Sequence, residues 1–274
     1  MVLAQANVVT GEGIHECFLE AEIAPDVVIN CVALSQPAAC ERDPELASLV
    51  NIPHKLLAAL RLHKERTSHC PLLIHLSTDQ IYDGSKAHWK EDDMTAPINV
   101  YGQTKLEAEQ EIGREWPHHV VLRSSIIYGP PPPGAPVNRG LFLQFIKRSI
   151  ESKQMTEFFA DEWRCPIYVK DIVAVCQAFI QSHSRTLKDH EAAPKIFNMG
   201  GPQRMSRVDM AMAVAKVCSL DPSYINAVPA STVPRGVPSP ADISMDSSLL
   251  ENTINTKFTI FSDALTAIFS VETS

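Results

Sequence analysis

The stretch "DVVINCV" (residues 26–32) decides how the fold of this chain is predicted. It is a near-continuous apolar run that follows a proline, which is typical of a parallel strand buried on both faces of its sheet. Two further apolar runs, "LLIHLS" (72–77) and "HVVLRSSIIYG" (119–129), come later in the chain. Helical patterns over residues 45–65 and 100–116 lie between these three runs. Because strands alternate with helices of this length, the sequence predicts an α/β fold with a parallel sheet.

Two details of the helical patterns give further expectations. Pro53 lies inside the first pattern and should kink or split it, because proline has no backbone N–H to donate. In the second pattern, Glu107, Glu109 and Glu111 are expected to be largely solvated.

The pattern changes after the third apolar run. The stretch "GPPPPGAPVNRG" (129–140) is expected to be a loop because of its prolines and glycines. Ser206 and Asp209 have the spacing of a capping box at the start of a helix. The elements expected after the loop are helices over 141–153, 172–181, 206–220 and 261–271 and a strand over 195–199. We therefore predict a sheet-and-helix core over residues 1–128 and a smaller region over 129–274. Elements of the smaller region can return to pack with the core.

Composition excludes several classes of protein. The formal charge of −8 and the pI near 5.7 argue against a nucleic-acid or anionic-membrane surface. No apolar run approaches the roughly 18 residues needed to span a bilayer, and no secretory signal is visible at the N-terminus. The seven cysteines are scattered without a C-x-x-C pair, which indicates a reducing, cytoplasmic environment rather than a disulfide framework. The histidines include no H-E-x-x-H, and no metal site is predicted.

Tyr101 and Lys105 form the sharpest chemical motif. They are four residues apart at the start of a predicted helix, so they share one face. An ordinary tyrosine pKa lies near ~10, and a nearby ammonium would lower it by stabilising the phenolate. The sequence therefore predicts a tyrosine that can donate a proton to a carbonyl, with the lysine also free to hold the hydroxyls of a ribose.

Ser77, Thr78 and Asp79 directly follow the second apolar run. Ligands of open parallel sheets bind at the carboxyl ends of strands, so a hydroxyl here could bond a substrate carbonyl. A Y-x-x-x-K pair alone is often only a pair on a surface helix. The ordered set of strand, S-T-D, acidic loop and N-V-Y-G-x-T-K-L is far more specific.

The chain resembles the extended short-chain dehydrogenase/reductase family. The stretches that carry the resemblance are "NCVALSQPAACERDPELASLVN" (30–51), "LSTDQIYDG" (76–84), "EDDMTAPINVYGQTKLEAE" (91–109), "LRSSIIYG" (122–129) and "YVKDI" (168–172). Within the family they are most similar to the dTDP-4-dehydrorhamnose reductase group, from which the regulatory β subunits of methionine adenosyltransferase branch. The resemblance covers nearly the whole chain. It implies a Rossmann-like, doubly wound sheet, with 1–128 as an incomplete NAD(P)-binding core and 129–274 as a mainly substrate-binding region.

The resemblance also implies residue roles. Thr78 would polarise the substrate carbonyl, Tyr101 would donate the proton, and Lys105 would support both Tyr101 and the cofactor ribose. The cofactor, NADP(H) or NAD(H), would contact Ala33, Ser77, Tyr101 and Lys105, and Asp79 would lie beside the substrate. These roles are expectations of the family, and spacing alone supports only Tyr101 and Lys105.

Three features depart from the reductase pattern. The family's strand and G-x-x-G-x-x-G phosphate loop have no match here, so cofactor binding is expected to be weakened. Ile126 stands where the reductases carry a tryptophan that helps hold the substrate. Ser239-Pro240 stands where an Arg-Pro pair is usual, so a cationic phosphate contact is expected to be lost unless Arg235 replaces it.

Three functional hypotheses stay open. The first is a regulatory subunit that binds a methionine adenosyltransferase catalytic subunit in S-adenosylmethionine biosynthesis, with weak or no catalysis. The second is an NADPH-dependent dTDP-4-dehydrorhamnose reductase that acts on a nucleotide sugar, and the third is a truncated isoform with neither activity. Ile126 favours the first, as do "DEWRCPIYVKDIVAVC" (161–176) and "MSRVDMAMAVAKVCSLDPSYI" (205–225), which resemble the regulatory branch.

The stretch "NVVTGEGIHE" (7–16) has the outline of a dinucleotide loop but fails as one. The position of a third glycine is occupied by Glu16, and only fifteen residues separate Gly11 from Asp26. Asp26 opens the predicted strand over residues 26–32, which is the fourth strand in the family. A first βα unit with its phosphate loop is therefore expected to be missing. Gly11 and Gly13 are then predicted to be turn residues.

Overall fold

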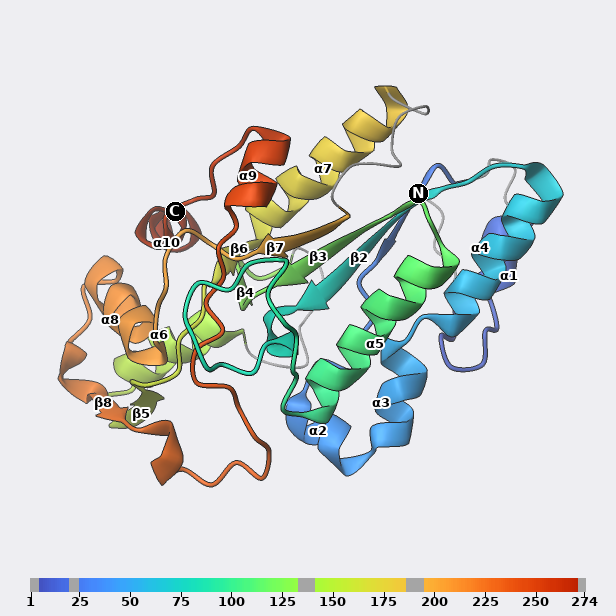
Figure 1. The fold of residues 1–274 in the computed structure, drawn as a ribbon. Coiled ribbons are helices and arrows are strands. Elements are labelled where there is room, and N and C mark those ends of the chain that lie inside the picture. The colour runs from blue at the N-terminus through green and yellow to red at the C-terminus, as the bar shows by residue number, and fades with distance from the viewer. Residues whose placement is uncertain (1–4, 20–24, 133–140, 186–194, 271–274) are drawn as a thin grey trace.

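Four parallel strands form the central sheet, shown in Figure 1 for a computed structural model that describes residues 5–19, 25–132, 141–185 and 195–270. Their order is β1 (Val27–Asn30), β2 (Leu72–Thr78), β3 (His119–Ser124) and β7 (Ile196–Met199). The three predicted strands therefore lie side by side, and the parallel α/β fold is confirmed. The fourth strand, β7, comes from beyond residue 129.

Strand β2 is buried on both faces, as its apolar run predicts. Its alternate residues Leu73, His75 and Ser77 face the side of the sheet that carries α5 (Val100–Glu115). Leu72 and Ile74 pack on the opposite side. Two polar side chains of this strand therefore point toward the helix that carries Tyr101 and Lys105, because side chains alternate along a strand.

Helices cover both faces of the sheet (Figure 1). One side has α1 (Ile14–Leu19), α2 (Pro37–Arg42), α3 (Pro44–Asn51), α4 (His54–Thr67) and α5, and the other has α7 (Val169–Arg185) and α9 (Ser248–Ile254). Pro53 lies between α3 and α4, so the predicted split is confirmed. Within the described residues, no helix is both long and apolar enough to cross a membrane.

The third predicted strand is shorter than the apolar run suggests. Pairing with β2 ends at Ser124, and Ser125 turns its hydroxyl toward Asp79. The chain then forms β4 (Ile127–Tyr128), which pairs with β6 (Ile167–Tyr168) in a separate two-stranded sheet. The prediction of one strand over residues 119–129 was therefore wrong, because a polar contact redirects the chain in its middle.

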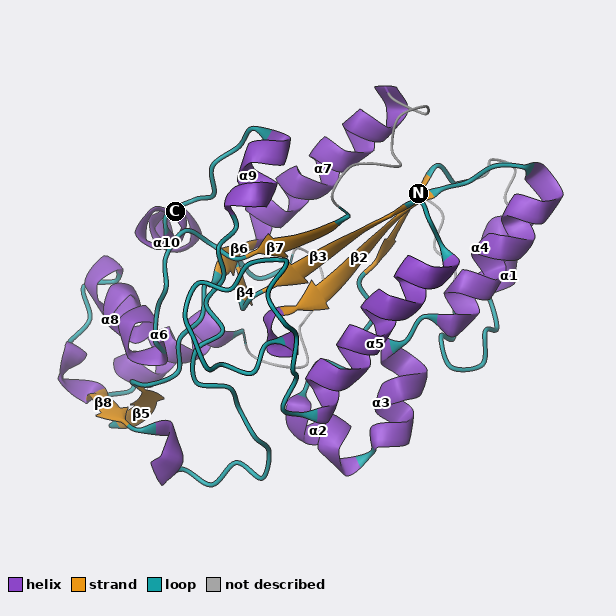
Figure 2. Cartoon of the chain, in the orientation of Figure 1, coloured by secondary structure: helices purple, strands orange, loops and turns teal. Residues whose placement is uncertain are grey.

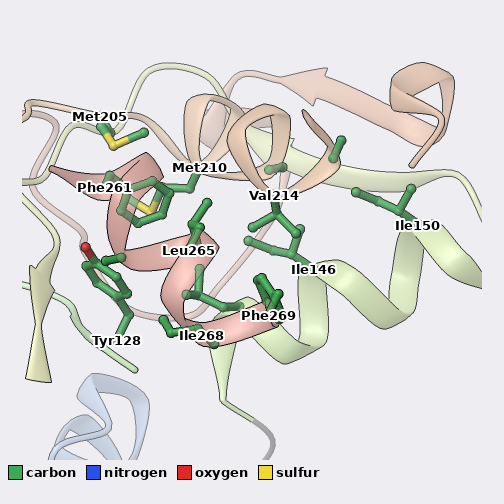
Figure 3. Packing of buried hydrophobic residues seen from close by; sticks show 14 of the residues in the cluster. Tyr128, Ile146, Ile150, Met205, Met210, Val214, Phe261, Leu265, Ile268 and Phe269 are labelled. Atoms are coloured by element: carbon green, nitrogen blue, oxygen red, sulfur yellow. The ribbon is translucent and has the colours of Figure 1, made fainter. Parts of the chain in front are cut away.

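The region after residue 129 has its own apolar core. It contains α6 (Phe142–Glu151), α8 (Arg207–Val217), α10 (Phe261–Phe269) and the pair β5 (Thr156–Phe159) and β8 (Ile225–Val228). Figure 3 shows Ile146 of α6 and Val214 of α8 against Leu265 of α10. Both arms of the predicted capping box are present at Ser206 and Asp209. Residues 133–140 of the predicted proline-rich loop lie outside the described residues.

Gly11 and Gly13 are turn residues, as predicted. Their φ angles are +87° and +79°, in the left-handed region that glycine adopts without strain. A Cβ at Gly13 would lie 2.1 Å from the Gln5 carbonyl oxygen, so the turn also requires glycine for space. Helix α1 begins directly after it, at Ile14.

Candidate functional site

The candidate site lies where β1 and β2 end and α5 begins. Asn99 caps α5 by accepting a hydrogen bond from the Gly102 N–H at 2.9 Å. A Cβ at Gly102 would lie 2.2 Å from the carbonyl oxygen of Gln80, in the turn that follows β2. Glycine therefore lets the first turn of α5 pack directly on the turn that contains Thr78 and Asp79. The connection between these two turns forms neither helix nor strand apart from η1 (Asp79–Ile81) and isolated bridges (Figure 2).

Lys105 lies deep in the site, with 1% of its surface exposed. Its Nζ is 2.9 Å from Nε2 of His75 and 2.6 Å from the carbonyl oxygen of Leu76. Burial lowers the pKa of Lys105 to about 8, although the nearby Glu109 carboxylate opposes this shift. The lysine is therefore bonded to strand β2.

Tyr101 lies on the same face of α5, one turn before Lys105, as its spacing predicts. Its side chain is buried beside Cys40 and Ala47. Burial raises the pKa of Tyr101 to about 12, while a hydrogen bond with Thr78 opposes the rise. The expected lowering of this pKa by Lys105 is therefore not found, because the Lys105 Nζ bonds β2 at His75 and Leu76 and burial dominates at the phenol.

Thr78 is the last residue of β2, Asp79 directly follows it, and both are buried. The Thr78 hydroxyl accepts a hydrogen bond from the Gln80 N–H at 3.2 Å and thereby caps η1. Asp79 accepts a hydrogen bond from the Ser125 hydroxyl at 2.7 Å. Burial raises the pKa of Asp79, and the Arg164 guanidinium partly offsets this effect. The structure therefore brings Thr78, Asp79 and Tyr101 together at the end of the sheet.

Ser77 belongs to a buried polar network. Its hydroxyl donates to Oε1 of Glu109 at 2.5 Å, and Arg123 binds Oε2 of the same carboxylate at 2.8 Å. Glu109 is only 4% exposed, so the prediction that it is largely solvated was wrong. The helical period predicted a polar face, but it could not reveal an arginine on the buried strand β3.

Ala33 is half-buried in the segment after β1, next to Leu34. The side chain of Asn51 accepts from the Leu34 N–H at 2.7 Å and donates to the Thr104 hydroxyl at 2.9 Å. Asn51 therefore ties the segment after β1 to α5. Neither Asn51 nor Thr104 was predicted from the sequence, in which the available signal is an asparagine just before Pro53 in a helical pattern.

Guanidinium groups gather on the side of the site nearest the C-terminal region. Arg164 donates to the carbonyl oxygen of Pro240 at 2.9 Å and to the Ser239 hydroxyl at 3.3 Å. An arginine therefore does stand beside Ser239-Pro240, although it comes from another part of the chain. Arg235, the expected replacement, pairs with Glu162 instead.

A nicotinamide cofactor fits only part of this site. Tyr101 and Lys105 lie at the carboxyl end of the sheet, where the ribose of such a cofactor binds. The turn at Gly11 offers no phosphate cradle, because the amides of residues 9–12 are already bonded within the turn, to Asn7 and Thr10. Among the described residues, the turn at Gly11 is therefore not a pyrophosphate site.

A family model matches nearly the whole chain. The model of the RmlD substrate binding domain matches residues 2–273. The chain belongs to the RmlD substrate binding domain family. This match confirms the resemblance that the sequence motifs indicated. That resemblance covers both the dTDP-4-dehydrorhamnose reductases and the methionine adenosyltransferase β subunits.

Members of the RmlD family from both groups are similar to this chain. The methionine adenosyltransferase 2 subunit beta of Xenopus tropicalis is 31% identical over 233 residues, which cover 84% of this chain and 65% of that subunit. A dTDP-4-dehydrorhamnose reductase of Mycolicibacterium smegmatis is 29% identical over 222 residues, which cover 79% of this chain and 61% of the reductase. The chain thus spans less than two thirds of the length of these two relatives.

A solved structure confirms the Rossmann-like fold. The dTDP-4-dehydrorhamnose reductase of Bacillus anthracis, solved in complex with NADP, superposes with a TM-score of 0.81 at 17% identity. The match covers 97% of this chain and 87% of that chain. At this identity the likeness concerns the fold alone.

Proposed function

We propose that this chain is a reductase-fold subunit of a methionine adenosyltransferase, which binds a nicotinamide nucleotide and has little or no turnover of its own. Its membership of the RmlD family and its likeness to the Xenopus tropicalis β subunit support the proposal. Ile126 supports it as well, since an aliphatic side chain offers no stacking face for a sugar. The observation that carries the proposal is the raised pKa of Tyr101 together with the bonding of Lys105 to strand β2.

A general acid works best when its pKa lies near the working pH. The pKa of Tyr101 is raised to about 12 by burial, so its hydroxyl is a poor proton donor at neutral pH. Lys105, which would have to lower that pKa, instead bonds His75 and the Leu76 carbonyl. In this arrangement the pair is not set for acid–base catalysis.

The bound nucleotide would be NADP(H) or NAD(H), which supplies hydride chemistry when a reductase of this fold uses it. Tyr101 and Lys105 would lie beside its nicotinamide ribose, with the backbone at Ala33 and the hydroxyl of Ser77 along the same side. Affinity is expected to be weakened, because the turn amides at residues 9–12 are engaged within the turn.

Co-purification tests this proposal. The tagged chain, expressed together with a methionine adenosyltransferase catalytic subunit from its own organism, should elute with it as one complex in size-exclusion chromatography with light scattering. The complex should also change the substrate affinity or product inhibition of that catalytic subunit. NADPH titration of the recovered material measures the nucleotide site separately. Two separate peaks at concentrations of about 10 μM, an ordinary range for specific complexes, would exclude the assembly.

A nucleotide-sugar reductase is the second candidate function, and the arginines near Asp79 favour it. The positive charges of Arg164 and Arg207 both lower the pKa of Asp79. Guanidinium groups also bind phosphate oxygens well. Burial and the neighbouring Arg164 lower the pKa of Arg207 to about 10, so a bound anion would relieve repulsion between the two cations.

The test of this second function is the oxidation of NADPH in the presence of dTDP-4-dehydrorhamnose, followed by absorbance. We expect Arg207→Gln to raise KM if a diphosphate binds there, and Tyr101→Phe to abolish turnover. If the wild-type chain consumes no NADPH above the rate without substrate, the reductase function is wrong.

A further inference from the structure

The side-chain amide of Asn30 has a fixed orientation. Its Oδ1 accepts a hydrogen bond from the Val32 N–H at 3.1 Å. Its Nδ2 lies 3.0 Å from Nδ1 of His75. If the amide were rotated by half a turn, Nδ2 would face the Val32 N–H, and two donors would oppose each other. The amide of Asn30 therefore presents a donor to His75.

This orientation determines where His75 carries its proton. A neutral imidazole has one N–H and one acceptor nitrogen. Burial holds the pKa of His75 well below its usual range, so the ring is neutral, and its surface is 0% exposed. Since Nδ1 accepts from Asn30, the proton lies on Nε2. That N–H points at Nζ of Lys105, which is 2.9 Å away.

A donor at Nε2 requires an acceptor at Lys105. An ammonium has three N–H donors and no lone pair, whereas a neutral amine has two donors and one lone pair. The neutral amine accepts from His75 and still donates to the Leu76 carbonyl at 2.6 Å. The hydrogen bonds of this site are therefore satisfied only when Lys105 is uncharged.

We propose that Asn30 and His75 are positioning residues that hold Lys105 as a neutral amine, by fixing the His75 proton on Nε2. Protonation of Lys105 is then linked to the tautomer of His75. An ammonium can form at the same place only if the proton of His75 moves to Nδ1 and the Asn30 amide turns away from Val32. The protonation state of Lys105 does not depend on the proposed function. Any consequence for the binding of a nicotinamide ribose rests on that function.

The charged groups around Lys105 and His75 act on the protonation of the pair in both directions. Glu109, one turn along α5 from Lys105, favours the ammonium, but Arg123 and Ser77 already bind its carboxylate. Cys31, after β1, acts weakly in the same direction as Glu109. On β3, His119 disfavours a second positive charge at His75. Burial outweighs the effects of Glu109 and Cys31 and lowers the pKa of Lys105 to about 8, so the neutral amine predominates above that pH.

Nuclear magnetic resonance on the full chain without cofactor tests the inference. Long-range proton–nitrogen spectra report the tautomer of His75, and the shift of the Lys105 Cε, followed from about pH 6 to about pH 11, reports the pKa of its amine. Signals are assigned with His75→Gln and Lys105→Met. We expect a Lys105 pKa at least one unit below the ordinary value of ~10.4, and the Nε2–H tautomer of His75 at pH values above that pKa. An Nδ1–H tautomer at those pH values, or a Lys105 pKa within one unit of ~10.4, would overturn the proposal.

Asn30→Asp tests the cause. A carboxylate of the same shape accepts a proton from Nδ1, so His75 should change to the Nδ1–H tautomer and the Lys105 pKa should rise by about one unit or more. Cys31→Asp is the matched control, since it adds the same charge one residue away without touching His75. That variant should raise the Lys105 pKa, while His75 keeps the Nε2–H tautomer at pH values above the raised pKa.

The remaining outcomes are also decisive. An Asn30→Asp protein that keeps both the wild-type tautomer and the wild-type Lys105 pKa contradicts the role of Asn30. If the tautomer and pKa are as expected but NADPH does not bind, the inference stands and the proposed nucleotide site is wrong. The two failures are therefore distinguishable.

Discussion

Replacing Arg123 by methionine is expected to lower the free energy of unfolding by about 3–5 kcal/mol, because removal of one partner leaves a buried charge uncompensated. Arg123 donates to both carboxylate oxygens of Glu109, which is 4% exposed. It also donates to the hydroxyl of Tyr82 and the carbonyl oxygen of Glu91. After the substitution, Ser77 alone would donate to the carboxylate. Urea denaturation followed by circular dichroism measures the change.

Arg114→Met is the matched control for this substitution. Arg114 pairs with Glu111 on the same helix as Glu109, but its side chain is 66% exposed. Exposed ion pairs contribute about 0–1 kcal/mol, so this variant should unfold close to the wild-type midpoint. Equal effects of the two substitutions would mean that the Glu109–Arg123 pair is not buried as described.

Gly102→Ala is the second substitution with a large expected effect. The added Cβ would lie 2.2 Å from the Gln80 carbonyl oxygen and 2.8 Å from Cβ of Pro97, so α5 must move away from the turn after β2. Overpacking of this kind costs about 1–3 kcal/mol. The movement would also displace Tyr101 and Lys105, and NADPH titration of the folded variant should show weaker binding than wild type.

Gly113→Ala provides the control on the same helix. A Cβ at Gly113 meets nothing within 4 Å, and alanine is the better helix former. This variant should be more stable than wild type by up to ~1 kcal/mol and should leave the nucleotide site unchanged. The two alanine substitutions therefore have opposite expected signs in thermal unfolding, and a shared sign would contradict the close approach at Gly102.

Local signals in the sequence were sufficient for most elements of the fold. The apolar runs gave three strands of the sheet, Pro53 marked the boundary between two helices, and the spacing of Ser206 and Asp209 identified a capped helix. Each of these depends on residues that are close together in the chain. The break after Ser124 could not be read in this way, because its cause is a hydrogen bond from Ser125 to Asp79, which is distant in sequence.

The placement of the candidate residues could be predicted from the sequence, but their bonding could not. Spacing correctly placed Tyr101 and Lys105 on one helical face, and the end of β2 supplied Thr78 and Asp79. The partner of Lys105 could not be found from sequence, because β2 is buried on both faces and nothing in its pattern tells which side His75 takes. For the same reason, nothing in the sequence indicates that Lys105 bonds β2 and leaves Tyr101 with a raised pKa.

The connection between η1 and α5 is held in place by residues near the end of the chain. The Trp89 N–H donates to the carbonyl oxygen of Ser244, and its indole Nε1 donates to that of Asp242, which is 153 residues away in sequence. Synthesis at about 5–20 residues per second separates the two partners by on the order of ten seconds. The hydrogen bonds that hold the segment leading into Tyr101 and Lys105 can form only once residues 242–246 have been made, so we expect the candidate site to be among the last parts of the protein to become ordered.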